Sequence, residues 1–421
     1  MKRNILIVAM FVSYTMVQAQ NVGIGTNEPK AGLHIINNNG FIARGEFNSG
    51  VDLPDSGLGT RLIWYPKKAA FRAGRVAINA TTWNDAEIGI HSIGLGLETK
   101  AKGNASISLG AYTQALGSPS VALGFGSVTT EPSCVAIGSL AKANANNSTA
   151  IGYNALAGYT TTRGQYSFAI GNGTTSAYTT GGHFAIGDNS FAIGNQCYTL
   201  SNGSFAIGNG SSTGLLFNSP DQGFNSYAIG NSCLATGNYS FAIGNNSNTN
   251  GHSGSFVIAG RTDGVQVVEG FDNHMLMQFA GGYHFQTNLA ASLGVYMNPS
   301  GNSWLSFCDK NKKEATLLMN DEEVLKKIGA IDYYSWRYKD DPDKTNRHYG
   351  VMAQDFYNAF GKDELGVIGN DTAVNPIDML GVVFSAIKAL EKRTTLLEAE
   401  NERLQTELAN IKRKKRTVEN E

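Results

Sequence analysis

The chain is poor in charge, in proline and in long apolar segments. Charged residues make up 16% of its 421 residues, well below the usual quarter, and the formal net charge is −1. This balance argues against a global attraction to nucleic acid or to an anionic membrane. Beyond the first twenty residues no apolar stretch is long enough to cross a membrane as a helix. We therefore expect a chain with no membrane span once its N-terminus is removed.

Metal and cofactor signatures are also missing. The four cysteines, Cys134, Cys197, Cys233 and Cys308, show no CxxC or Cys/His spacing, and the seven histidines are scattered through different segments. We expect no metal and no cofactor. A disulfide framework stays open for an exported protein, but the favoured interpretation is that single thiols lie in the turns between repeats.

Glycine, in contrast, is abundant and periodic. The chain holds 50 glycines, and a Ser-x-Ala-Ile-Gly unit recurs, as in 204–208 and 240–244. The closing glycines Gly96, Gly110, Gly124, Gly138 and Gly152 are each fourteen residues apart. A short fixed period predicts a solenoid, and the absence of an apolar 3.6-residue period argues against helix.

Alternation along an extended strand divides each unit into two faces. Phe205 and Ile207 share one face, while Ser204, Ala206 and Gly208 share the other. We expect the Phe and Ile face to fill the core and the small face to let another backbone approach. A fourteen-residue coil accommodates two strands of about five residues and two turns, which predicts a β-roll with coils about 4.8 Å apart.

Such a roll is too thin to be stable alone, which suggests lateral association. The repeated unit resembles the head repeats of trimeric autotransporter adhesins over residues 88–261. This resemblance implies a mainly β fold in which three chains pack side by side as left-handed parallel β-rolls.

The N-terminus is typical of a secretory signal peptide over residues 1–19. Lys2 and Arg3 precede an apolar run from Ile5 to Val12, and a cleavage site is expected after Ala19. The alternative, a retained membrane anchor, requires a longer apolar span. The mature protein is thus expected to be exported, either secreted or held at the cell surface. Residues 20–87 are interpreted as a β stem and residues 262–302 as a β adaptor.

Residues 303–393 hold the chemistry, if the chain has any. The stretch from Gly350 to Asp355, Gly-Val-Met-Ala-Gln-Asp, and the Tyr-Ser-Trp segment 334–336 resemble the intramolecular chaperone domain of the endosialidase type. The resemblance implies a small α+β domain that templates a trimer and cuts the chain just before a serine. That serine is followed by Asp and, five residues on, by Lys.

This chain has Cys308, Asp309 and Lys313 at those places, so the nucleophile departs from the family pattern. A thiol can perform the equivalent acyl shift once deprotonated, and a neutral lysine is a suitable base. Lysine is neutral near pH 7 only when buried. The predicted catalytic residues are therefore Cys308, Lys313 and Asp309, with cleavage between Phe307 and Cys308. The alternative is an inactive domain that still nucleates trimers.

The C-terminal segment predicts self-association independently of any resemblance. Apolar residues alternate at four- and three-residue spacing, with Thr394 and Asn401 at two of the seam positions, which indicates a coiled coil and a basic tail over residues 394–421. The remaining seam positions are Val383, Ile387, Leu390, Leu397, Leu404, Leu408 and Ile411. Heptads alone do not separate two strands from three, and the adhesin resemblance favours a homotrimer.

Two functions follow. The first is a secreted, trimeric, adhesin- or tail-fibre-like protein whose rod presents a surface to a glycan or a protein, with no nucleic acid as a partner. The alternative is a glycan-degrading, tail-spike-like solenoid enzyme, which would need paired carboxylates along a groove. The coils contain few acidic residues, and Glu98, Glu131, Asp188 and Asp221 do not recur at stacked positions.

Overall fold

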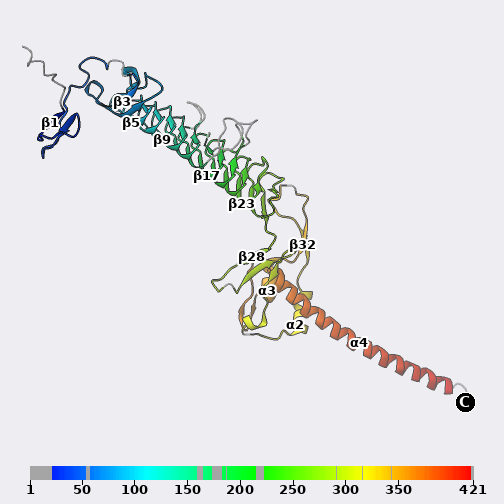
Figure 1. Ribbon diagram of the computed structural model, residues 1–421. Helices are drawn as coiled ribbons and strands as arrows, with labels where there is room; N and C mark the ends of the chain where they lie inside the picture. Colours follow the sequence, from blue (N-terminus) through cyan, green and yellow to red (C-terminus); the bar gives the residue numbers. More distant parts are fainter. Residues whose placement is uncertain are drawn as a thin grey trace, which may run out of the picture. The chain divides into compact units, whose positions relative to one another are not determined.

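The computed structural model describes residues 21–53, 57–158, 165–172, 183–185, 187–214, 222–290, 292–314, 316–342 and 344–418 (Figure 1). The predicted signal peptide lies outside these residues. The chain divides into two compact units, residues 1–283 with 297–302, and residues 284–296 with 303–421. Over the described residues, no helix combines the length and the hydropathy that a membrane crossing requires.

The first unit is a two-sheet parallel solenoid, as the glycine period predicts. Its longer strands form a 14-stranded sheet. In chain order these strands are β3 (Gly59–Tyr65), β4 (Ala70–Val76), β5 (Ile93–Leu97), β7 (Ile107–Ala111), β9 (Ser120–Phe125), β11 (Cys134–Ser139), β13 (Thr149–Tyr153), β15 (Phe168–Asn172), β17 (Phe191–Asn195), β19 (Phe205–Asn209), β21 (Tyr227–Asn231), β23 (Phe241–Asn245), β25 (Phe256–Gly260) and β27 (Met275–Gln278).

The second sheet of each coil is narrower than the predicted five residues, because its strands have two or three. It contains 11 strands, namely β6 (Lys100–Ala101), β8 (Gln114–Ala115), β10 (Val128–Thr129), β12 (Lys142–Ala143), β14 (Ala155–Ala157), β16 (His183–Ala185), β18 (Tyr198–Thr199), β20 (Ser212–Thr213), β22 (Leu234–Ala235), β24 (Ser247–Asn248) and β26 (Val267–Val268). A coil with so short a second strand leaves a narrow interior.

That interior is filled by small side chains, which overturns the predicted assignment of the two faces. Ser204 and Ala206 are 1% and 0% exposed, and the buried cluster around them consists of alanines and cysteines. Phe205 and Ile207 share a face as predicted, but they lie on the outside of the roll and stay half-exposed. The alternation correctly grouped the residues, but the small group faces inward, because the interior of so small a coil is already filled by side chains the size of Ser, Thr, Ala and Cys.

Serine and threonine make the interior partly polar. The Ser204 hydroxyl donates to the Ser201 carbonyl at 2.5 Å and accepts from the Thr213 hydroxyl at 2.8 Å. The same arrangement links Ser120 to Gly117 and Thr129. These bonds satisfy hydroxyl groups that would otherwise be costly to bury.

The outward residues of the long sheet form two continuous files, which we call the outer stripe. The strand register aligns them from β3 to β27, and every position is apolar except Thr149. One file is Trp64, Phe71, Ile93, Ile107, Val121, Val135, Thr149, Phe168, Phe191, Phe205, Tyr227, Phe241, Phe256 and Met275. The other is Leu62, Ala73, Leu95, Leu109, Leu123, Ile137, Ile151, Ile170, Ile193, Ile207, Ile229, Ile243, Ile258 and Met277.

Aromatic rings stack along the later part of the first file. The ring centroids of Phe191 and Phe205 lie 4.9 Å apart at an interplanar angle of 3°, and those of Tyr227 and Phe241 lie 4.7 Å apart at 6°. Offset or parallel stacking at this spacing adds to the strand pairing. The stripe is therefore an ordered apolar surface, with a spacing set by the backbone.

The first coil is closed by β4, which pairs in parallel with β5 and antiparallel with β3. Arg72 of β4 is 1% exposed, and its guanidinium donates to the Ser92 hydroxyl at 2.8 Å and to the Ala101 carbonyl at 2.9 Å. Burial lowers the pKa of Arg72 to about 10. Trp83, fully buried, donates its indole N–H to the Thr99 carbonyl at 2.8 Å. Nearer the N-terminus, β1 (Val22–Ile24) pairs in parallel with β2 (Leu33–Ile35). Two 3-10 turns complete this region: η1 (Pro66–Lys68) connects β3 to β4, and η2 (Asp85–Glu87) lies between Trp83 and β5.

The second unit is a small α+β domain. Its strands are β28 (Tyr283–Gln286), β29 (Gly294–Met297), β30 (Leu305–Ser306), β31 (Tyr334–Trp336), β32 (His348–Gly350), β33 (Lys362–Asp363) and β34 (Gly366–Val367). Its helices are the turn η3 (Lys310–Lys312), α2 (Asp321–Gly329), α3 (Ala353–Phe360) and α4 (Pro376–Val418). Val324 of α2, Phe356 and Phe360 of α3 and Ala386 of α4 form its core.

Candidate functional site

A tight turn after β30 brings the predicted catalytic residues together. Asp309 caps the 3-10 turn η3 by accepting the Asn311 N–H at 2.9 Å on its side chain. The Lys313 N–H closes the turn by donating to the Lys310 carbonyl at 3.2 Å. Asp309 thus shapes the turn, and the chain reverses far enough for the fifth residue after Cys308 to return to it.

Within this turn the Lys313 ammonium nitrogen lies 2.9 Å from the Cys308 sulfur. The two groups are in hydrogen-bonding contact, which is the geometry required of a nucleophile and its base. Both residues are exposed in the single chain. The burial that the proposed chemistry needs at Lys313 is therefore not supplied by the single chain's own packing.

The residue before Cys308 is held from two sides. The Phe307 ring lies 5.2 Å from the Tyr296 ring, and the Lys312 ammonium lies 5.5 Å from the centroid of the Phe307 ring. Phe307 is half-buried. These contacts restrain the side chain of Phe307, the residue on the N-terminal side of the predicted cleavage.

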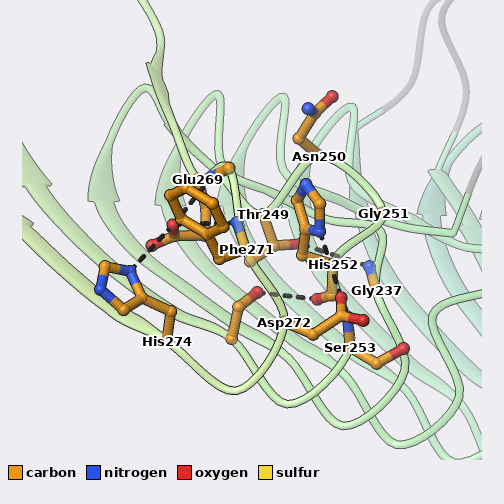
Figure 2. A network of polar contacts seen from close by, with 12 residues as sticks. Gly237, Thr249, Asn250, Gly251, His252, Ser253, Glu269, Phe271, Asp272 and His274 are labelled. Atoms are coloured by element: carbon orange, nitrogen blue, oxygen red, sulfur yellow. Dashed lines mark hydrogen bonds and ion pairs between the residues drawn. The ribbon is translucent and has the colours of Figure 1, made fainter. Parts of the chain in front are cut away.

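A second polar cluster lies at the last coils of the roll (Figure 2). His252 Nδ1 is 3.1 Å from the Asp272 carboxylate, which also accepts the Ser253 N–H at 2.9 Å. His274 Nδ1 is 3.0 Å from Glu269, which accepts the Gly270 N–H at 2.8 Å. These contacts tie the segment between β26 and β27 to the turn after β24. No trio of His, Cys, Asp or Glu in the described part of the chain could hold a metal ion.

Glu269 is the most buried member of this cluster, at 3% exposed. Burial acts to raise the pKa of its carboxyl, but the hydrogen bonds from the Gly270 N–H, from His274 and from the Phe271 N–H outweigh it and lower the pKa. The sequence gives no signal for these pairs, because His252 and Asp272 are joined across an irregular segment. Their geometry indicates a closure of the roll.

The remaining predicted residues fall into separate places. Glu98 is 8% exposed and accepts the Ala77 N–H at 2.6 Å and the Thr82 hydroxyl at 2.9 Å, so it serves the first coil. Cys134, Cys197 and Cys233 are buried, and each thiol contacts a backbone carbonyl. Residue 221 lies outside the described residues. The predicted heptad positions lie on α4, with Leu397 and Ile411 more than 60% exposed.

Comparisons with known families agree with this division of the chain. Residues 88–113, 101–127, 135–155, 185–211 and 222–247 match the YadA head domain repeat. Residues 308–363 match the chaperone of endosialidase, and this match begins at Cys308. No curated protein matches the chain. The alternative of a glycan-degrading enzyme gains nothing from these matches, and the chain carries repeats of the YadA head type followed by a domain of the chaperone of endosialidase type.

Proposed function

We propose that the chain is one subunit of an exported homotrimeric fibre of the adhesin or tail-fibre kind. In this proposal three left-handed β-rolls pack side by side, and the C-terminal domain acts as an intramolecular chaperone for their assembly. The matches to the YadA head repeat and to the chaperone of endosialidase support an extracellular or surface location. The exposed face of the rod would meet a surface glycan or a protein.

The outer stripe is the observation that carries this proposal. It runs over fourteen strands, so at a strand spacing of about 4.8 Å it is about 60 Å long. Contiguous apolar surfaces of this extent mark interaction sites. A partner that covers the apolar residues of every strand must repeat at the strand spacing of about 4.8 Å, and a second copy of the roll has the same spacing.

The heptad seam on α4 is a second apolar surface that is exposed in the single chain. Leu390, Leu397, Leu404 and Leu408 are 50%, 66%, 48% and 52% exposed, although they are apolar and regularly spaced. Seam residues of this kind pack into holes on neighbouring helices of a coiled coil. The helix therefore supports the same assembly as the roll, through a different surface.

Light scattering tests the assembly. We expect three chains per particle for the natural chain, and a lower mass for the double variant Ile207→Lys with Ile243→Lys, because both place charge in the outer stripe. Leu156→Lys with Leu234→Lys is the matched control, since these half-exposed residues lie on the short sheet. A well-folded single chain at micromolar concentration would contradict the proposal, as would equal effects of the two pairs.

We also propose that Cys308 starts a self-cleavage. Its sulfur attacks the Phe307 carbonyl carbon, and Lys313 takes the thiol proton and passes it to the departing Cys308 nitrogen. The resulting thioester is open to hydrolysis, which would release the C-terminal domain. Packing of the three copies would supply the burial that the single chain lacks at Lys313. Mass spectrometry of proteolytic peptides should show that the peptide bond between Phe307 and Cys308 is broken, a change that Cys308→Ala and Lys313→Ala abolish and Lys310→Ala leaves intact. Only full-length mass with no effect of these substitutions would end this part of the proposal.

A further inference from the structure

Lys313, the proposed base, is also a primary amine, and it lies next to the Cys308 sulfur that would carry the acyl group. This inference rests on the first half of the proposed self-cleavage, the formation of a thioester between Phe307 and Cys308. We propose that Lys313 captures the acyl group, so that the reaction of this chain ends in an isopeptide bond between Phe307 and Lys313. The fibre and its chaperone domain then stay covalently joined.

The geometry of the turn places the amine beside the sulfur that would carry the acyl group. After the acyl shift the Phe307 carbonyl carbon is bonded to Sγ, and Sγ lies 2.9 Å from the Lys313 nitrogen. The cap by Asp309 and the contacts of the Phe307 ring with Tyr296 and Lys312 hold both partners in place. The lysine amine and the acyl group would thus be neighbours within one turn, and such proximity favours an intramolecular reaction.

Water competes for the same carbon, because Cys308 and Lys313 are exposed. Bulk water is present at about 55 M, whereas well-oriented intramolecular nucleophiles reach effective molarities of about 10⁵ M or more. Amines also attack thioesters much more readily than they attack oxygen esters. Cysteine in place of the family's serine therefore changes the partner lysine from a base alone into the favoured acceptor.

The proton and electron balance closes without any other reactant. In the first step the thiol proton passes through Lys313 to the Cys308 nitrogen, which leaves the lysine amine neutral. In the second step the lysine nitrogen attacks the carbonyl carbon, the carbon–sulfur bond breaks with its electron pair on sulfur, and a proton moves from nitrogen to sulfur. One amide has replaced another, so the mass is unchanged and residues 308–312 become a short branch with a free Cys308 amine.

The experiment is intact-mass measurement of the purified full chain, combined with a cyanobenzothiazole label for the free aminothiol of an N-terminal cysteine. We expect full-length mass, one labelled aminothiol per chain, and a tryptic peptide in which Phe307 is joined to Lys313 and cleavage after Lys313 is lost. Two fragments that separate between Phe307 and Cys308 would overturn the inference while leaving self-cleavage in place. Full-length chain without a labelled aminothiol would overturn the inference and the self-cleavage together, and the trimer is judged separately by light scattering.

Three variants sharpen the result. Cys308→Ser should give an oxygen ester that water hydrolyses, so the product changes from branched chain to two fragments. Lys313→Arg keeps the positive charge but removes the nucleophilic amine, so the branched peptide should disappear. Lys310→Arg, an exposed lysine of the same turn, is the neighbouring control and should leave the branched peptide unchanged; loss of the branched peptide in this variant would count against Lys313 as acceptor. Circular dichroism of each variant shows whether the domain is folded.

Discussion

Replacement of one repeat-closing glycine by alanine should break the stack locally. Gly208 has a φ of +124°, and an added Cβ would lie 1.9 Å from the Gly230 carbonyl oxygen of the next coil. Ordinary contact begins at 3.4 Å, so the two coils would have to separate by roughly 1.5 Å. The hydrogen bonds between β19 and β21 cannot survive that separation, because they fail beyond about 3.5 Å.

The cost can be estimated from these two effects. Alanine in a backbone region reserved for glycine costs about 1–3 kcal/mol, and each lost backbone hydrogen bond costs about 1 kcal/mol. With two or three bonds lost beside Gly208, Gly208→Ala should destabilise the roll by about 4 kcal/mol. Gly210→Ala is the matched control, because its φ is +65° and its nearest neighbour would be 3.6 Å away. Left-handed strain alone predicts about 1 kcal/mol there.

Urea unfolding followed by circular dichroism, at one fixed protein concentration, measures both variants. Hydrogen exchange should also show that loss of protection in Gly208→Ala is centred on β19 and β21. Equal urea midpoints for Gly208→Ala and Gly210→Ala would refute the close-approach argument. Both glycines have a positive φ, but only at Gly208 would the added Cβ meet the backbone of the next coil.

Three further predictions concern the interior, the first coil and the thiols. Ala206→Leu should destabilise the roll by about 1–3 kcal/mol or more, because the interior has no room for it, whereas Ile207→Leu on the outer stripe should cost less in the same urea assay. Hydrogen bonds lower the pKa of the Glu98 carboxyl despite its burial. The stability that ionised Glu98 contributes is therefore present above the ordinary pKa of about 4.3 and is lost as the pH falls through the lower pKa of the folded state. In Glu98→Gln, the free energy of unfolding should fall less steeply below about pH 4. Burial raises the pKa of the Cys134, Cys197 and Cys233 thiols. Iodoacetamide should therefore modify Cys308 alone in the folded protein and all four cysteines in urea. Labelling of Cys197 in the folded protein would contradict the packed interior.

The sequence was enough to predict the stack, because the closing glycines recur where an added Cβ would meet the backbone of the next coil. It was not enough to predict which face points inward. Alternation states that Phe205 and Ile207 share a face, but the width of the interior is set by the short strands of the second sheet, whose length no period reveals. The assignment therefore failed on a distance between sheets and not on the pattern itself.

The contacts of the candidate site could likewise be predicted from the sequence only in part. Cys308 and Lys313 lie within one turn, so their spacing alone brought them together, and the structure places them 2.9 Å apart. The contacts of His252 with Asp272 and of His274 with Glu269 depend on how an irregular segment returns to the end of the roll. Contacts within one turn can be predicted from the spacing of residues, whereas a contact made by a returning loop depends on the three-dimensional fold.

The hydroxyl- and alanine-lined interior affects how the protein responds to temperature. The heat capacity change of unfolding grows with newly hydrated apolar area and shrinks with newly hydrated polar area. A coil whose inside is Ser204, Ala206 and Thr213 exposes little hydrocarbon and several polar groups when it opens. The free energy of a single roll should therefore vary only gently between cold and warm conditions. In the proposed trimer, most of the curvature of the stability with temperature should arise from the burial of the outer stripes between copies.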